Sequence, residues 1–116
     1  MSSAAVFFSV VTGLAMLASS ALDFTMSPKA VAIVTRLGKR PEFVRFLGLI
    51  KGLGGLGLLI GLVINPIGVL AALGLVIYFI LAIRAHSKLG DSGTETLPAA
   101  AMFLLSAVTL LTKLFS

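Results

Sequence analysis

Four long apolar segments, separated by short polar connectors, constrain the fold of this chain more than any other feature. They span Ala4–Leu22, Phe46–Val63, Ile67–Ile83 and Leu97–Leu114. Each has roughly the 17–25 residues that an α-helix needs to cross about 30 Å of hydrocarbon. Charged residues make up 11% of the sequence, whereas a soluble domain carries about 25%. Lipid is therefore the expected surroundings of these segments.

We expect an all-α membrane protein, with the four segments packed as an antiparallel transmembrane bundle. The expected helices lie at about 4–23, 43–63, 67–86 and 97–115 of a single domain over 1–116. A signal peptide is the alternative for the first segment, because Ser19–Ala21 resembles a small-residue cleavage site. No Lys or Arg precedes that segment, and it is long for the apolar part of a signal peptide. We therefore expect it to be retained.

The first polar connector carries signals for a short helix. Ser27 and Pro28 are typical of an N-cap and first helical position, and Gly38 is typical of a helix end. The apolar residues between them recur at helical spacing: Ala30, Val31, Ile33, Val34 and Leu37. This pattern predicts a short interfacial helix between helices one and two. An ordinary connector turn is the alternative.

The basic residues gather beside the two longer connectors. Five lie in or beside the first connector (Lys29, Arg36, Lys39, Arg40 and Arg45), and Arg84 and Lys88 lie beside the second. Lys113 is near the opposite end of the fourth segment, where its long side chain can reach the interface. The positive-inside rule predicts a multi-pass cell-membrane protein with cytoplasmic connectors and both termini outside. Because these residues flank spans rather than forming a groove-reading motif, we expect no nucleic-acid partner.

Helix two is rich in glycine. At 100° per residue, Gly48, Gly52 and Gly55 fall on one side, and Gly54, Gly57 and Gly61 fall on the opposite side. Small residues let transmembrane helices approach closely. We therefore predict that helix two is sandwiched between two neighbours, is the most buried helix, and packs on a stripe of helix three that includes Ala71 and Gly74.

Lys51 is the most unusual residue in the apolar segments. It lies about 12 Å into helix two at 1.5 Å per residue, where lysine costs on the order of 2.5–3.5 kcal/mol. Asp23, Tyr78 and His86 are expected on the same side of the membrane. We predict an intramembrane polar cluster of Asp23, Lys51, Tyr78 and His86. The alternative is that Lys51 extends to the near interface without a specific partner.

No catalytic or metal-binding motif is recognisable. The chain has no cysteine and one histidine, so disulfides, thiolate metal sites and a haem held by two histidines of one chain are excluded. Asp91 and Glu95 are not accompanied by further residues that could complete a metal site. We expect no catalytic residues, no metal and no cofactor held by a recognisable motif, with a quinone or a lipid as the ligands to consider.

Several segments together resemble a known family. They are Ser20–Phe24 at the end of helix one, the glycine-rich Leu47–Leu59, the Asn65–Pro66 break, and Tyr78–His86 followed by Gly90–Asp91. This order is similar to the DoxX-like family of small four-helix membrane proteins. Members often carry a lysine near the position of Asp23 and a glutamate near that of Lys51. The signs are reversed here, and this reversal favours an Asp23–Lys51 contact.

Three functions remain open at this point. The resemblance implies a non-enzymatic accessory subunit of a larger membrane complex, with another membrane protein or a second copy as partner besides lipid. The alternative is a subunit of a membrane oxidoreductase, or an enzyme acting on a quinone or another lipophilic molecule, since the name-giving members are similar to a subunit of thiosulfate:quinone oxidoreductase. A transporter is the third, and the lack of broken helices and repeats disfavours it.

Overall fold

The computed structural model describes residues 2–88, 90 and 93–115, and five α-helices make up most of this part of the chain. They are α1 (Ser3–Phe24), α2 (Pro28–Arg36), α3 (Phe43–Ile60), α4 (Asn65–Lys88) and α5 (Gly93–Leu114). The helices α1, α3, α4 and α5 are long and apolar enough to cross a membrane. The predicted all-α membrane fold, with a short helix between the first two spans, is confirmed.

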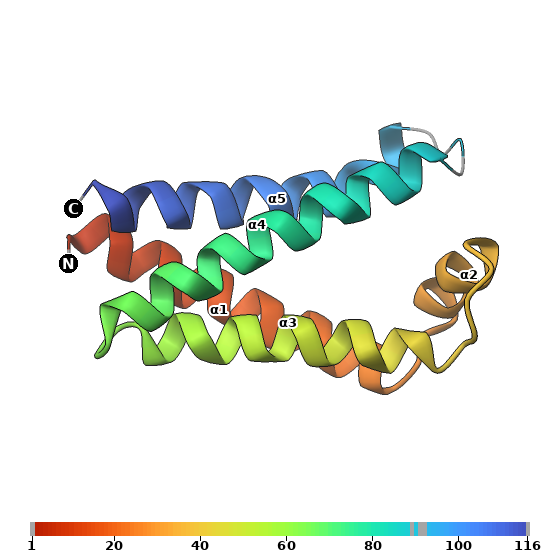
Figure 1. The fold of residues 1–116 in the computed structure, drawn as a ribbon, viewed down its shortest axis with the longest axis horizontal. Coiled ribbons are helices and arrows are strands. Elements are labelled where there is room, and N and C mark those ends of the chain that lie inside the picture. Colours follow the sequence, from red (N-terminus) through yellow and green to blue (C-terminus); the bar gives the residue numbers. More distant parts are fainter. Residues whose placement is uncertain (1, 89, 91–92, 116) are drawn as a thin grey trace.

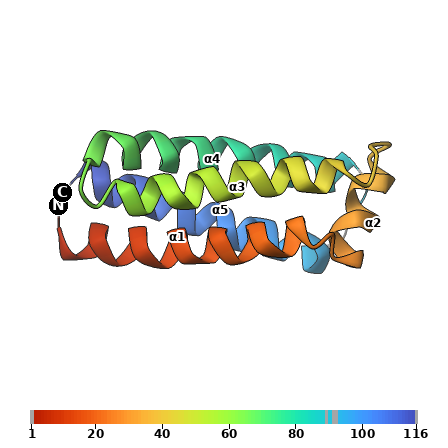
Figure 2. The same cartoon turned by 90° about the horizontal axis from the view of Figure 1, so that it is seen from below.

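The four long helices run in alternating directions and form an elongated molecule with extents of 41 × 25 × 17 Å. Both termini and the α3–α4 turn lie at one end, which we call the terminal end (Figure 1). The short α2 lies at the other, which we call the α2 end (Figures 1 and 2). The long dimension is close to the thickness of a bilayer with its headgroups, about 40–45 Å.

The start and stop signals of α2 act as the sequence predicts. The Ser27 hydroxyl accepts a hydrogen bond from the Ala30 N–H at 3.4 Å, and Pro28 occupies the first turn. Gly38 follows the helix with a φ of +79°, a conformation that glycine adopts without steric cost, and its N–H donates to the Thr35 carbonyl. The alternative of an unstructured connector turn is wrong for this segment.

The turn between α3 and α4 begins earlier than expected. The helix α3 ends at Ile60 rather than near residue 63, and α4 begins at Asn65. A Cβ at Gly61 would collide with the backbone of Gly68, so the two chains touch where α3 gives way to the turn. Pro66 falls in the first turn of α4, where its missing N–H costs nothing.

The last helix also begins earlier than expected. The helix α5 starts at Gly93 rather than near residue 97, so Pro98 lies inside the helix and not in its first turn. A proline there removes one backbone hydrogen bond. The helix continues through Pro98 because the packing of α5 along α4 outweighs the loss of this hydrogen bond.

The helix α3 packs on α1 through the side that carries Gly48, Gly52 and Gly55. A Cβ at Gly48 would lie 2.8 Å from Asp23 Cβ, and one at Gly55 would lie 2.8 Å from the Gly13 carbonyl oxygen. At Gly52 it would lie 2.9 Å from a side-chain hydroxyl of α1. Alanine at these positions would force the two helices apart, so glycine is what allows this close approach.

The opposite side of α3 touches α4. A Cβ at Gly57 would lie 2.7 Å from Ala71 Cβ, and Gly61 faces Gly68. The expectation for Gly74 is wrong, because a Cβ there would meet nothing within 4 Å. Gly74 lies on an outward-facing side of α4, since the contact with α3 uses the face that contains Gly68 and Ala71.

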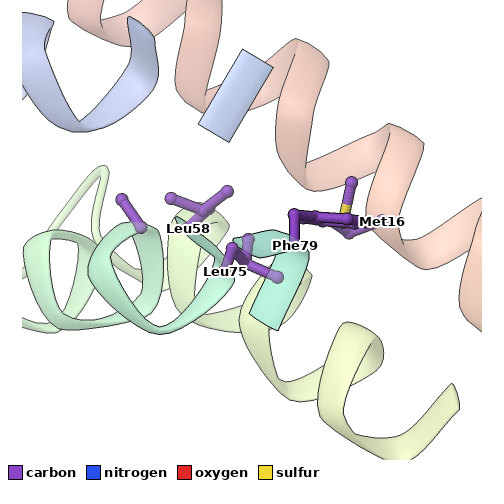
Figure 3. Close-up of a cluster of buried hydrophobic side chains, with 5 residues drawn as sticks. Met16, Leu58, Leu75 and Phe79 are labelled. Carbon is purple, nitrogen blue, oxygen red and sulfur yellow. The ribbon is translucent and has the colours of Figure 1, made fainter. Parts of the chain in front are cut away.

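The apolar core lies in the middle of the bundle. Met16 of α1, Leu58 of α3, and Leu75 and Phe79 of α4 are buried against one another (Figure 3), together with Ala72. The prediction that helix two is the most buried span is wrong, because α1 is buried to a larger extent than α3. The buried residues of α1 extend from Ala5 to Asp23, over almost its full length, where α1 packs on α3 and α5.

Candidate functional site

An ion pair between partly buried Lys51 and buried Asp23 joins α1 to α3 toward the α2 end of the bundle. Lys51 Nζ lies 3.0 Å from Asp23 Oδ2 and donates a hydrogen bond to Ser19 Oγ at 3.0 Å. The side chains of Lys51 and Asp23 are 15% and 8% exposed. Asp23 Oδ2 has no hydrogen-bond partner of good geometry in the described part of the chain. The positive charge of Lys51 is therefore what compensates this carboxylate.

The close packing of α1 on α3 brings these groups together. The Ser20 hydroxyl donates to the Gly48 carbonyl at 2.6 Å, and the missing side chain of Gly48 leaves room for Asp23. Lys51 follows Gly48 by one turn of α3, so its side chain reaches Asp23 without leaving the helix interface. Glycine on one helix thus positions the charge pair between two helices.

Tyr78 approaches the ion pair from α4. Lys51 Nζ lies 5.9 Å from the centroid of its ring, at the outer limit of a cation–π contact. The Tyr78 ring also packs edge to face against Phe79, with centroids 4.9 Å apart. Phe79 belongs to the apolar core, so this stack joins the polar group to the rigid centre of the bundle.

A cavity of about 480 Å³ opens beside the ion pair, within the volume range typical of ligand sites. All five helices line it. The apolar lining includes Ile33 and Val34 from α2, Leu47 and Ile50 from α3, Ala82 and Ala85 from α4, and Ala99 and Met102 from α5. Ser19, Asp23, Lys51, Tyr78 and His86 supply its polar groups. The cavity is therefore apolar along its walls and polar at a few points.

The four residues of the predicted cluster take different places. Asp23 and Lys51 are in contact, and Tyr78 is beside them. His86 lines the same cavity from the last turns of α4. Sequence reasoning missed Ser19 as part of the site. Its spacing of four residues from Asp23, which places both on one face of α1, is the signal that could have found it.

The α2 end carries an exposed cluster of positive charge. Lys29, Arg36, Lys39, Arg40, Arg45, Arg84 and Lys88 are all exposed there. Lys39 Nζ also lies 5.9 Å from the centre of the Phe43 ring. This end therefore presents cations around the cavity, as the distribution in the sequence implies.

A second group of buried polar residues lies between α1 and α5, toward the terminal end. The hydroxyls of Thr12 and Thr109 are 2.8 Å apart, and Ser9 is fully buried beside this face of α1. Lys113 is also buried, only 4% exposed, with its amine against Gly68 of α4. Glycine at position 68 leaves space for this amine between the helices.

Comparison with known proteins adds one match. The model of a family described as the DoxX-like family matches residues 7–109, which include all of α3 and α4 and most of α1 and α5. No curated protein and no solved structure matches the chain.

Proposed function

The chain belongs to the DoxX-like family, and within it we propose that this membrane protein is a non-catalytic subunit that holds a lipophilic molecule for a larger complex. One observation carries the proposal: an apolar cavity of about 480 Å³ is lined by a partly buried lysine whose charge is compensated by Asp23. Ligand sites combine apolar walls with a few placed polar groups in this way. The walls would hold an apolar chain and the polar groups would orient its head.

Two exposed residues that line the cavity support entry of a ligand from the membrane. Two of its lining residues, Phe46 of α3 and Leu81 of α4, are also 53% and 59% exposed on the outer surface. Both helices span the membrane, so these side chains lie where acyl chains would contact them. A lipophilic molecule can then reach the cavity from the bilayer without crossing water.

A second candidate function is that of an oxidoreductase subunit, or an enzyme, acting on a quinone. The observation that favours it is that Lys51 and Tyr78 lie close together and both line the cavity. Each has a hydrogen-bond donor, and the carbonyl oxygen of a quinone ring could accept hydrogen bonds from both. The two functions share the ligand site and differ in whether a reaction occurs there. Consumption of bound quinone by the isolated chain with a reductant would favour the second.

The test is purification in mild detergent, followed by identification of bound proteins and extracted small molecules. We expect a stoichiometric membrane partner and one enriched lipophilic compound. Ala99→Phe, which fills the cavity from α5, should lower retention of that compound by about tenfold, whereas Ala101→Phe, on an exposed position of the same helix, should not. Equal retention in both variants would refute the ligand site, and a chain that purifies alone would refute the subunit role.

A further inference from the structure

The ion pair that lines the cavity has no net charge. Lys51 and Asp23 carry opposite charges at a separation of 3.0 Å, and the exposed basic residues at the α2 end are not among the residues that line the cavity. A buried lysine by itself would attract anions, such as fatty acids or lipid phosphates. Here the carboxylate of Asp23 already occupies that role from within the protein.

A second anion would fit this site poorly. It would have to leave water for an apolar cavity while facing the negative charge of Asp23. The single positive charge of Lys51 would then have to compensate two anions. A cation is disfavoured as well, since it would leave water to face the positive charge of Lys51.

Hydrogen-bond donors remain for an uncharged head. An ammonium has three N–H groups, and within the described residues those of Lys51 reach Asp23 and Ser19. A third N–H is left for a ligand. The Tyr78 hydroxyl, which forms no hydrogen bond with the described residues, is a second available donor beside the cavity. Two donors match a carbonyl oxygen, which has two lone pairs.

We propose that the cavity selects an uncharged amphiphile whose head presents a carbonyl oxygen to Lys51 and Tyr78, and that Asp23 excludes anionic lipids of the same chain length. The inference rests on the proposed function, because it specifies the ligand class of the same cavity. The ring carbonyl of a quinone and the ester carbonyl of a neutral lipid share this chemistry. The mass of the compound extracted from the purified protein distinguishes these two sources.

Tyr78 itself provides the measurement. It is the single tyrosine, and the chain has no tryptophan, so tyrosine emission reports on this cavity. The protein is reconstituted in phosphatidylcholine vesicles, and a brominated 2-undecanone quenches Tyr78. Unlabelled 2-undecanone and decanoate then compete, each at its measured membrane concentration. We expect the ketone to displace the quencher at about tenfold lower concentration than decanoate.

Substitution of Asp23 should reverse this preference. Asp23→Asn leaves the charge of Lys51 uncompensated, so decanoate should bind at least about tenfold more tightly than to the wild type, with the ketone within about threefold of its wild-type value. Asp23→Glu keeps the charge and should keep the ketone preference. If Asp23→Asn does not fold, the double variant Lys51→Met, Asp23→Asn serves instead, and it should lose the preference for the ketone over an undecane of equal length.

The outcomes separate the two claims. Quenching that is the same in wild type and Ala99→Phe, with no displacement by any competitor, would refute the cavity as a ligand site. Saturable binding in which decanoate competes as well as the ketone would leave the ligand site standing and overturn the selection by Asp23. An undiminished preference for the ketone over decanoate in Asp23→Asn would overturn it as well. An undiminished preference for the ketone over undecane in the double variant would overturn the hydrogen bond from Lys51 to the carbonyl oxygen.

Discussion

Lys51 of α3 and Asp23 of α1 form an ion pair, 3.0 Å from Nζ to Oδ2, inside a bundle whose helices are otherwise nearly free of charge. Each residue alone would be a costly charge in lipid surroundings. Together they join two helices that also meet through Gly48. The pair therefore links the stability of the bundle to the polar end of its cavity.

The ion pair predicts a specific energetic coupling. Lys51→Met removes the cation and leaves the Asp23 carboxylate buried without compensation, which should destabilise the bundle by about 3 kcal/mol. Adding Asp23→Asn should restore part of that loss, with a coupling energy of about 1–2 kcal/mol. Unfolding of the four proteins of this double-mutant cycle in mixed micelles measures both quantities. Strictly additive losses would show that the two charges do not interact.

The glycine contacts predict unequal effects of one added methyl group. Gly55→Ala should cost about 2 kcal/mol, because the new Cβ would lie 2.8 Å from the Gly13 carbonyl oxygen. Gly61→Ala should cost at least as much, since it meets the backbone of Gly68. Gly74→Ala is the matched control on an open side of α4, and it should leave stability unchanged or raise it by up to about 1 kcal/mol. Thermal unfolding in detergent ranks the three, and equal melting temperatures would contradict the packing described here.

The threonine pair between α1 and α5 predicts a small coupling. Thr12 and Thr109 are buried with their hydroxyls 2.8 Å apart, but Thr109 also donates to the Leu105 carbonyl at 2.7 Å. Because an alternative acceptor exists within the helix, a Thr12→Val, Thr109→Val cycle should give only about 0.6 kcal/mol. The same unfolding assay measures it. A coupling as large as that of the ion pair would mean that this contact, and not Lys51–Asp23, is the main polar link of the bundle.

The distribution of basic residues predicts the orientation in the membrane. The chain has no cysteine, so single cysteines can be introduced without background. Lys39→Cys, exposed at the α2 end, should react with a membrane-impermeant reagent only after the cells are opened. Val63→Cys, 89% exposed in the turn at the terminal end, should react in intact cells. The reverse pattern would invert the orientation and leave the fold as described.

Much of the architecture follows from local properties of the sequence. The four apolar runs are long enough to span a bilayer, and Ser27, Pro28 and Gly38 delimit α2 through cap and turn preferences that depend on neighbouring residues alone. The division of the α3 glycines between two sides follows from 3.6 residues per turn. Even the contact between Asp23 and Lys51 could be proposed, because a deep charge in lipid requires compensation.

Other features depend on which helix faces which, and only the tertiary structure decided them. Gly74 has the same local spacing as a packing glycine yet faces outward, and Lys113 is buried because Gly68 of another helix leaves space for its amine. The cavity forms only because all five helices converge around groups far apart in sequence. Periodicity determines which residues share a face of one helix. The partner of that face is determined by the packing of the whole bundle, which periodicity does not encode.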